Sequence, residues 1–584
     1  GGTYFPARDG DRGSRSGFLT LLRRLRSTYD TEGDRVAETA ARITQAIREE
    51  LASPSGTDLP GPQVLHAAAT FYRDHFDPGE GGVAGTPKFP GTLPIRFLLR
   101  YHRRTGDPQS LRMATLTLEK MAAGGICDQV GGGFHRYSTD GRWLVPHFEK
   151  MLYDNALLAL TYLEGYQATG RQDFARVTRE ILRYVERDMT SPEGAFYSAT
   201  DADSLGPQGG REEGRFFTWT PGEIETSLGK DRARVVLALY GVSPEGNFDG
   251  RSILHVPRPV EAVARELRLS THEVQSTRDE ARDLLYAARS RRPAPSRDEK
   301  ILTGWNGLMI SAYARAAMVL DDERYARKAE QAAGFILKRR APDGRLPHDA
   351  AKGAAGGVAF LSDYAFFTAG LLDLFEATGD IRWLREALGF DRVLEEHYED
   401  RREGGFFQSG DDQEKLLARE KPGYDGAEPS GNSLAVLNLL RLYEITTQER
   451  FRERAEKALR AFHGILERSP ASLSEMLLAV DFRLDTPKEI VIVTPRSKAD
   501  AAPFLSRLRG LFLPNRILLV ASEGKDLLEL SKLTPLLEGK VAPKGRTTAY
   551  VCEKQVCELP TADPEVFGRQ IRRIALLPKS AGPG

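Results

Sequence analysis

Four segments of the sequence carry apolar side chains on nearly every face of a helix: residues 152–163, 308–320, 364–375 and 434–442. A helix that is apolar all round is one that is buried all round. Each segment is followed by a short turn and then by an amphipathic helical pattern. After the first, for example, Phe174, Val177, Ile181 and Val185 form a single apolar stripe at helical spacing. The sequence therefore predicts buried helices that are each covered by an outer helix.

These segments belong to a repeated unit. Similar turns join buried and outer segments, at Thr105-Gly106-Asp107, Thr169-Gly170-Arg171 and Thr378-Gly379-Asp380. Glycine suits the residue after a helix because a left-handed backbone costs it little. Outer segments run into glycine-aromatic loops at residues 131–138, 193–198 and 403–409, with a weaker copy at 344–348. The predicted pairs are 91–104/108–123, 150–170/172–189, 305–320/322–340, 362–378/381–399 and 430–446/449–468.

Buried helices backed by outer helices predict two concentric rings. The expected fold class is mainly α, a six-hairpin α/α toroid with a small C-terminal α/β part. Residues 271–291 have a helical pattern and are expected to complete the sixth pair. An open solenoid of stacked hairpins is the alternative. It does not readily explain inner helices that are apolar on all faces, so we favour the closed ring.

Two regions are expected to lie outside the ring. Residues 1–60 contain a loop, two helices at 17–28 and 33–51, and a linker rich in proline, glycine and serine. The ring is predicted to span 61–485. Beyond it, in 486–584, buried strand patterns at 489–494 and 516–521 enclose a helical pattern at 500–511. This order is typical of a β-α-β unit.

Composition excludes several classes of protein. The 82 Lys and Arg residues balance the 82 Asp and Glu residues, so the excess positive charge typical of nucleic-acid or anionic-membrane binding is absent. No apolar run approaches the ~18–20 residues that span a bilayer, and the first residues do not resemble a signal peptide. Three cysteines, Cys127, Cys552 and Cys557, exclude a disulfide scaffold and fit a reducing compartment. We therefore expect a cytoplasmic protein without nucleic-acid or membrane partners.

Polar residues mark the start of four inner helices: Tyr153-Asp154-Asn155, Trp305-Asn306-Gly307, Asp363-Tyr364 and Ser430-Gly431-Asn432. One interpretation is N-capping, because Asp, Asn and Ser accept bonds from the free N–H groups of a first turn. In a closed ring, however, these helix ends converge on the axis. A pocket lined by carboxylates, amides and aromatic rings suits a sugar, whose C–H faces stack on rings while its hydroxyls bond polar groups.

The segment 128–155 has the densest chemistry, with His135, Arg136, Trp143, His147 and Glu149. The spacing of His147 and Glu149 is poor for one metal ion, and a zinc site would usually need further His or Cys ligands. Each histidine has a structural alternative, as a hydrogen-bonded residue of the fold. We expect no metal site and no cofactor.

Three other loops carry carboxylates, and they contain Asp203, Asp298, and Asp425 with Glu428. Acidic residues at a helix start are favoured by the helix dipole, so a structural role is possible for these as well. The chain has no nucleophile elbow, phosphate-binding loop or H-E-x-x-H motif. Cys552 and Cys557 lack the redox or zinc spacing, and we interpret both as structural.

Taken together, seven motifs resemble one family: GGTYFP (1–6), TPKFP (86–90), GGGFHRYSTDGRWLVPHFEKMLYDNALL (131–158), EGAFYSATDADS (193–204), DEKILTGWNGLMI (298–310), LSDYA (361–365) and DGAEPSGNS (425–433). The sequence resembles thioredoxin-domain-containing proteins of the spermatogenesis-associated protein 20 type over essentially its whole length. The resemblance implies a thioredoxin-like domain followed by a six-hairpin glycosidase-like barrel, similar to those of N-acylglucosamine 2-epimerases. It also implies that most of the thioredoxin-like domain, with its cysteine motif, would lie upstream of Gly1.

Three functions remain open from the sequence. Glycosidase-type hydrolysis needs a carboxylic acid and a second carboxylate; the expected catalytic residues are Asp154, Asp298, Asp363, Glu149 and His147. A sugar epimerase would instead use His135 and His147 as bases, with Arg136 beside the intermediate. A non-catalytic binding or scaffold module is the third. The residues expected to bind sugar are His135, Arg136, Trp143, Tyr153, Asn155, Asp203, Trp305, Asn306, Tyr364, Asp425, Glu428 and Asn432.

Overall fold

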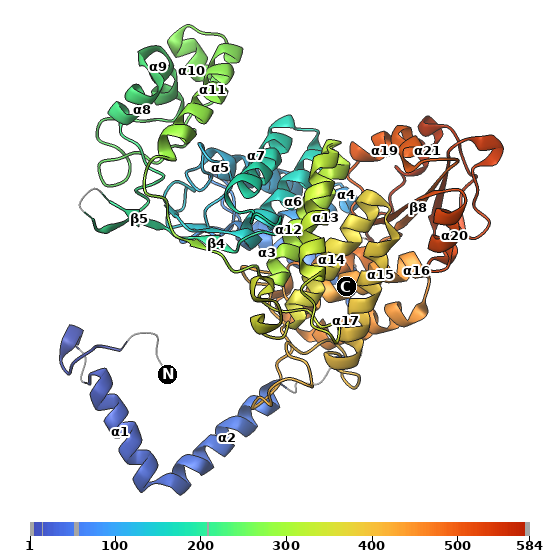
Figure 1. The fold of residues 1–584 in the computed structure, drawn as a ribbon, viewed down its shortest axis with the longest axis horizontal. Coiled ribbons are helices and arrows are strands. Elements are labelled where there is room, and N and C mark those ends of the chain that lie inside the picture. The colour runs from blue at the N-terminus through green and yellow to red at the C-terminus, as the bar shows by residue number, and fades with distance from the viewer. Residues whose placement is uncertain (1–4, 14–15, 52–55, 57, 207–208, 579–584) are drawn as a thin grey trace, which may run out of the picture. The chain divides into compact units, whose positions relative to one another are not determined.

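The computed structural model describes residues 5–13, 16–51, 56, 58–206 and 209–578. It divides into two compact units, residues 1–54 with 413–421, and residues 55–412 with 422–584. Figure 1 shows the elements of both. The first four residues of the GGTYFP motif lie outside the described part of the chain. The predicted domain boundaries at residues 60 and 485 remain predictions.

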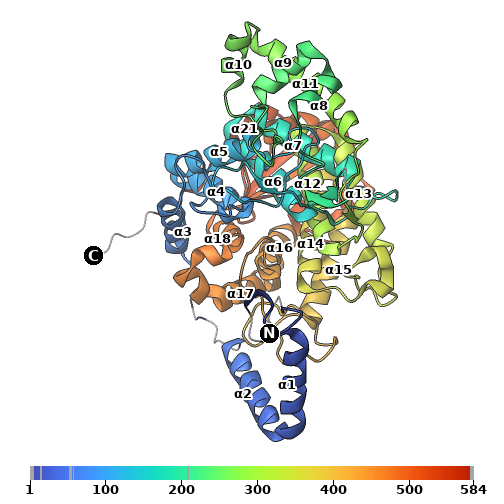
Figure 2. The ribbon, with the colours of Figure 1, turned by 90° about the vertical axis from the view of Figure 1, so that its left-hand side faces the viewer.

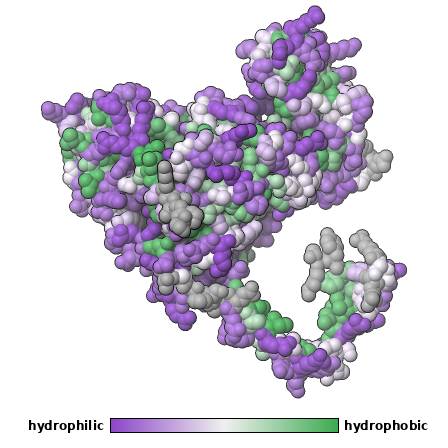
Figure 3. All heavy atoms as spheres, turned by 180° about the vertical axis from the view of Figure 1, so that it is seen from behind, coloured by the Kyte–Doolittle hydropathy of each residue, from purple (hydrophilic) through white to green (hydrophobic). Residues whose placement is uncertain are grey.

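The smaller unit contains two helices in contact with each other, α1 (Phe18–Thr31) and α2 (Gly33–Leu51). Both predicted helices are therefore confirmed. Apolar side chains of this unit are exposed, among them Leu25 at 57%, Tyr29 at 64% and Ile43 at 54%. Figure 3 shows apolar atoms gathered along these two helices.

Six inner helices of the larger unit form a closed ring: α4 (Ile95–Thr105), α6 (Leu152–Thr169), α12 (Thr303–Leu320), α14 (Leu361–Thr378), α16 (Gly431–Thr446) and α18 (Met476–Leu484). Each contacts the next, and α18 returns to contact α4 (Figure 2). The ring buries nearly the whole surface of its central members, as their all-round apolar sequence predicts. The closed toroid is confirmed, and the open solenoid is wrong.

An outer ring covers these helices. Its members are α3 (Pro62–Asp74), α5 (Pro108–Ala123), α7 (Gln172–Asp188), α13 (Glu323–Leu337), α15 (Ile381–His397) and α17 (Glu449–Arg468). All five predicted helix pairs are confirmed. The predicted glycine turns are confirmed as well, because Gly106, Gly170 and Gly379 end their helices with φ of 74°, 72° and 65°.

The sixth pair of inner and outer helices differs from the prediction. It is formed by α3 and α18, which lie near opposite ends of the unit's sequence and contact each other. Helix α11 (Thr271–Arg289) packs instead against α8 (Pro221–Leu228), α9 (Lys230–Leu239) and α10 (Val260–Leu267). These four helices share a separate core. The prediction that 271–291 completes the ring is therefore wrong, because an amphipathic stripe shows that a helix packs but not on what.

The C-terminal part contains the predicted β-α-β unit. Strand β8 (Lys488–Thr494) pairs in parallel with β9 (Arg516–Ser522) and antiparallel with β10 (Thr548–Glu553), which pairs with β11 (Val556–Cys557). Helix α19 (Ala502–Arg509) connects the parallel strands, and α20 (Lys525–Ser531) and α21 (Pro564–Gln570) follow. One face of β8 and β9 joins the core of the toroid, and the other packs against Phe504 and Phe567.

Short strands order the loops at one end of the ring. They are β1 (Tyr137–Ser138), β2 (Pro146–His147), β3 (Lys150–Met151), β4 (Ala199–Thr200), β5 (Asp203–Leu205), β6 (Arg211–Glu213) and β7 (Arg297–Asp298). β3, β4 and β7 form one sheet. Among the described helices, none is long and apolar enough to cross a membrane.

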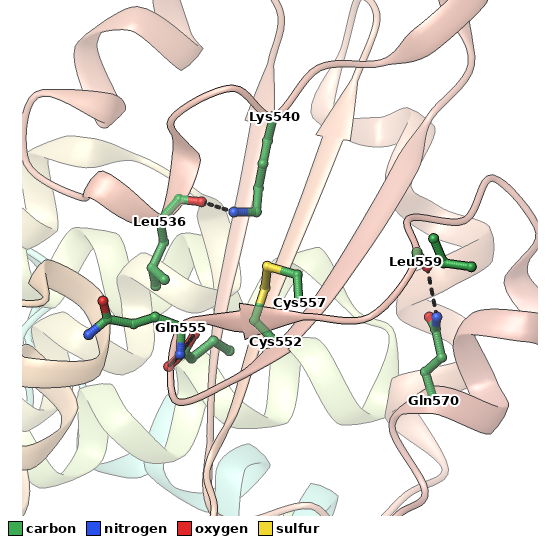
Figure 4. The surroundings of a disulfide bond; sticks show 8 residues. Leu536, Lys540, Cys552, Gln555, Cys557, Leu559 and Gln570 are labelled. Atoms are coloured by element: carbon green, nitrogen blue, oxygen red, sulfur yellow. Dashed lines mark hydrogen bonds between the residues drawn. A yellow bond between two sulfur atoms is a disulfide. The ribbon is translucent and has the colours of Figure 1, made fainter.

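A disulfide joins Cys552 of β10 to Cys557 of β11, which face each other across the two strands (Figure 4). The interpretation of both cysteines as structural did not include this bond, because a C-x4-C spacing alone does not reveal a hairpin between them. Cys557 is exposed and Cys552 is buried. The third cysteine, Cys127, is a buried free thiol, and burial raises its pKa.

Candidate functional site

Asparagines fix the glycine-aromatic loops to the first turns of three inner helices. The Asn155 side chain accepts a 2.8 Å hydrogen bond from the Phe134 N–H, and it donates to the carbonyls of Phe134 at 3.1 Å and Met151 at 2.9 Å. The same pair of hydrogen bonds, to the N–H and the carbonyl of one phenylalanine, joins Asn306 to Phe196 and Asn432 to Phe406. These amides are buried and fully engaged, so the prediction that they bind substrate receives no support from their positions.

In helix α14, a tyrosine hydroxyl instead of an asparagine amide holds the preceding loop against the helix start. The Tyr364 hydroxyl accepts a 3.1 Å hydrogen bond from the N–H of Leu346, in the weaker loop copy at 344–348. Tyr364 itself is fully buried. All four loops therefore lie over the N-terminal ends of inner helices, and they bring the side chains of these helix ends into one region.

The first part of this region is a chain of charged groups from segment 128–155. Arg136 lies beside the Tyr153 hydroxyl and forms a 3.1 Å ion pair with Glu149. The imidazole of His147 is held between two carboxylates, with Nε2 3.3 Å from Glu149 and Nδ1 2.8 Å from Glu213. The four charged or ionisable groups Arg136, His147, Glu149 and Glu213 are partly accessible and form a polar rim, whereas Tyr153 is buried.

The second part joins helices α6, α12 and the loop before α16. The rings of Tyr153 and Trp305 meet edge to face with their centroids 4.8 Å apart. The Trp305 indole then donates a 2.7 Å hydrogen bond to Glu428. Burial raises the pKa of Glu428, and the nearby negative charge of Asp363 adds to this rise. Tyr153, Trp305 and Glu428, which the sequence singled out separately, therefore form one connected series of contacts.

The third part is an imidazole-carboxylate pair. His348 Nδ1 lies 2.8 Å from Asp363 Oδ2, and this hydrogen bond raises the pKa of the imidazole. Asp363 is buried and also accepts hydrogen bonds from the backbone N–H groups of Gly304 and Phe360 at 2.9 and 2.8 Å. Sequence reasoning missed His348. One signal in the sequence could have indicated it: His348 ends the weaker glycine-aromatic loop at 344–348, which precedes the inner helix with Asp363 in its first turn.

Asp154 differs from the hydrogen-bonded carboxylates described above, those of Glu149, Glu428 and Asp363. Its side chain does not cap α6, and its buried Oδ2 has no hydrogen-bond partner among the described residues. Burial raises its pKa well above the usual value; Arg136 opposes this rise, whereas the charges of Glu428 and Glu149 increase it. N-capping, the alternative considered from the sequence, is therefore excluded for Asp154.

Asp154 faces a cavity of about 60 Å³ between the starts of α4, α6, α16 and α18, which Arg96, Asp425 and Glu475 also line. Asp425 is fully engaged, since it accepts bonds from the N–H groups of Ser430, Glu475 and Met476 and from the Ser433 hydroxyl. It thereby connects the starts of α16 and α18. Burial raises the pKa of Asp425 to about 6.

Four predicted site residues lie elsewhere. Asp298 is exposed on β7 and pairs with Lys300. Asp203 is in β5, paired with β6. Trp143 is fully buried, and its indole donates to the Glu80 carbonyl. His135 is buried with Nδ1 2.8 Å from the Phe148 carbonyl, and burial lowers its pKa to about 3. The structure therefore does not bring these four residues into the axial region.

One further group within the described residues could hold a metal ion. Ligand atoms of His397, Asp411 and Asp412 lie within 4.8 Å of one another. Both carboxylates are exposed, and Asp412 already forms an ion pair with Arg345. The group lies apart from Asp154, and its geometry alone does not establish a metal site.

The ring of six helical hairpins and the titratable cluster at one end of its axis define an α/α toroid with a candidate axial site. The chain belongs to the spermatogenesis-associated protein 20 family. It is 36% identical to spermatogenesis-associated protein 20 of Homo sapiens over 604 residues, which cover 97% of this chain and 76% of the human protein. The mouse protein is 35% identical over 607 residues, with the same shares. A scan against protein-family models found no match.

Solved structures with a similar chain trace include sugar-processing enzymes. A GH76 α-mannanase of Bacteroides thetaiotaomicron matches with a TM-score of 0.41 and 11% identity, over 72% of this chain and 95% of the enzyme. A sugar epimerase from a ruminal bacterium matches with a TM-score of 0.30 and 14% identity, over 73% of this chain and 99% of that enzyme.

Proposed function

We propose that the axial region binds a carbohydrate and hydrolyses a glycosidic bond, with Asp154 as the general acid. The observation that carries this proposal is the state of the Asp154 carboxyl. Its Oδ2 atom is buried and has no hydrogen-bond partner among the described residues, and the side chain faces a cavity. Its raised pKa keeps a proton available for the leaving oxygen.

Hydrolysis also needs a carboxylate to activate water or to attack the sugar directly. We assign this role to Glu149, which is oriented by Arg136 and His147 and whose charge acts on Asp154. We assign the aromatic contacts to Tyr153 of α6 and Trp305 of α12, whose rings meet edge to face. They would contact the C–H face of a pyranose ring.

The size of the cavity that Asp154 faces sets a condition on this proposal. Its volume of about 60 Å³ is far below the ~300–1,000 Å³ of typical ligand pockets. A sugar can therefore enter only if one wall moves. Gly426 and Ala427, both exposed, form part of that wall in the loop that precedes α16.

The test is a screen of aryl glycosides and oligosaccharides with purified full chain, followed by Asp154→Asn on any substrate that turns over. We expect the rate to fall by ~10²–10⁴ while the fold is kept. Asp298→Asn is the matched control and should leave the rate unchanged, because Asp298 is exposed and does not line the cavity. An unchanged rate in Asp154→Asn, or no hydrolysis across the panel, would overturn the proposal and leave the scaffold interpretation.

The His348–Asp363 pair favours a second candidate, a sugar epimerase or isomerase. This imidazole is partly accessible and lies near Glu428, whereas His135 is buried with a pKa of about 3 and is unsuited to act as a base. Incubation of candidate sugars in D₂O distinguishes the two reactions. Deuterium at the carbon next to the carbonyl would support the epimerase, and its loss in His348→Gln would assign the base.

A further inference from the structure

A second cavity lies deeper on the axis, toward the C-terminal ends of α12, α14 and α16. It has a volume of about 50 Å³, and five arginines line it: Arg96, Arg100, Arg315, Arg441 and Arg516. They come from α4, α12, α16 and β9. So many cations around one buried space would be unstable without anions, because desolvation of each charge costs several kcal/mol.

Protein carboxylates compensate only part of this charge. Glu164 forms ion pairs with Arg96, Arg100 and Arg315; Asp373 and Glu376 pair with Arg441; Glu376 also pairs with Arg516; and Glu475 pairs with Arg96. In the described part of the chain, these pairs set five guanidinium groups against four carboxylates. The cluster therefore carries one uncompensated positive charge.

Arg315 is the residue at which this surplus is localised. Its contact with a carboxylate is 3.3 Å long, to the Glu164 oxygen that Arg96 and Arg100 also approach. No hydrogen bond from its guanidinium is formed within the described residues, although Arg100 binds Glu164 through both nitrogens at 2.5 and 3.0 Å. Burial and the charges of Arg96 and Arg100 hold the pKa of Arg315 below its usual value.

The cavity has room for more than one water molecule, since a single water occupies only ~10–15 Å³. It also has a neighbour. A cleft of about 340 Å³ between the ends of α12 and α14 and the C-terminal sheet shares Glu376 and Arg516 with it. The Glu376–Arg516 ion pair, 2.5 Å long, therefore lies between the arginine cavity and the larger cleft.

We propose that this cavity is a binding site for a phosphate group, which completes the coordination of Arg315 and neutralises the axial cluster. Forked guanidinium groups match the geometry of phosphate oxygens, and several of them converge here. Arg96 lines both this cavity and that of Asp154, but Asp154 does not line this cavity, and the proposal does not depend on the proposed hydrolysis. The phosphate can be inorganic phosphate or the head of a phosphate monoester whose remainder occupies the adjoining cleft.

Equilibrium dialysis with radiolabelled inorganic phosphate tests the proposal at constant ionic strength. We expect one phosphate bound per chain, and a melting temperature that rises saturably by roughly 3 °C at ~100 times the dissociation constant. Glycerol phosphate forms the second arm. Tighter binding of the ester would identify an organic phosphate as the ligand, and equal or weaker binding would identify the free ion.

Two variants of Arg315 make the test specific. Arg315→Met should abolish phosphate binding, and Arg315→Lys, which keeps the charge without the fork, should weaken it at least tenfold. Arg324→Met on α13 is the matched control, since Arg324 is 77% exposed and pairs only with Asp322 among the described residues; it should bind like the parent chain. Absence of bound phosphate, or equal binding in Arg315→Met, would overturn the proposal. So would a higher melting temperature for Arg315→Met than for the parent chain in saturating phosphate, which would show an unbalanced ion-pair network without a ligand.

Discussion

Glu428, in the loop before α16, accepts a 2.7 Å hydrogen bond from the indole nitrogen of Trp305 in α12. The two residues are 123 positions apart in the sequence, yet they connect the starts of two inner helices on the toroid axis. The same indole lies against Tyr153 of α6. Trp305 thus couples three helix ends and a carboxylate whose charge acts on His348.

Trp305→Phe should raise the pKa of Glu428 further. The indole N–H and the nearby His348 stabilise the charged carboxylate of Glu428, whereas burial and the charge of Asp363 disfavour it. Removal of the indole donor therefore favours the protonated carboxyl. An NMR titration of ¹³C-labelled glutamate side chains measures the shift. Trp383→Phe is a suitable control, because the Trp383 indole has no hydrogen-bond partner in the described structure. An unchanged Glu428 titration in Trp305→Phe would contradict the assigned coupling.

Asp154→Asn should change how stability depends on pH. The folded state raises the pKa of Asp154 above its ordinary 3.8, so the folded state binds the proton more tightly than the unfolded one. Its contribution to stability is complete below pH 3.8 and is lost as pH rises through the folded pKa. Above both values the parent chain loses about 1.4 kcal/mol for each unit of the shift.

Denaturant unfolding at several pH values between 4 and 8 checks this expectation. Asp154→Asn should match the parent at low pH and be the more stable protein at pH 8. Parallel stability profiles for the two proteins would show that Asp154 is not held in its protonated form. A variant that is stabilised but inactive is the combination expected at a functional residue.

Asp363→Asn and Asp298→Asn should have different effects, although the sequence placed both among the catalytic candidates. Asp363 accepts hydrogen bonds from two backbone N–H groups and from His348, and its amide replacement would present a donor to one of them. We expect a loss of ~2–4 kcal/mol in the free energy of unfolding. Asp298→Asn removes an exposed ion pair and should cost less than ~1 kcal/mol.

The effect of Asp363→Asn should also vary with pH. Because Asp363 raises the pKa of His348 above 6.5, this part of the stability is present below pH 6.5 and is lost as pH rises through the folded pKa. The difference between variant and parent should therefore shrink in alkaline buffer. Urea unfolding at pH 5.5 and pH 9 provides the comparison, and a constant difference would argue against a charged His348.

Asn306→Ala should destabilise the toroid by ~2–4 kcal/mol. It would leave both the N–H and the carbonyl of Phe196 without partners inside the protein, and each unmet buried group costs ~1–3 kcal/mol. Asn155→Ala and Asn432→Ala should behave similarly, since each removes the equivalent pair of hydrogen bonds to a loop phenylalanine. A substrate-binding role would instead leave stability intact. Unfolding curves of the three variants distinguish the two roles.

Much of the fold could be predicted from the sequence because the inner helices are apolar on every face. That property fixes their burial, and the repeated glycine turns fix their length. The partner of α18 could not be predicted, because α3 lies some four hundred positions earlier and has an ordinary amphipathic pattern. Helix α11 has the same kind of pattern, and only the three-dimensional structure shows that it belongs to a separate core.

The candidate site was predicted less completely. Polar residues at helix starts look alike in the sequence, whether they anchor a loop, as Asn155 does, or remain unpartnered, as Asp154 does. The difference depends on where Phe134 and Arg136 lie, and this is set by the loops. The axial arginines were not predicted at all, since each stands alone among apolar residues and only ring closure brings them together.

The joining of α3 to α18 also has a consequence for how the chain assembles. During synthesis α3 is the first helix of the toroid to leave the ribosome, and its neighbour α18 emerges only after every other inner helix has been made. Until then, five hairpins form an arc whose end helices, α4 and α16, each expose an apolar flank. Contacts between residues so far apart in the sequence form slowly, and until they form, apolar surfaces that favour aggregation stay exposed. Nascent chains of this protein should therefore depend on chaperones up to the moment at which residue 484 becomes available, and should cease to depend on them soon after.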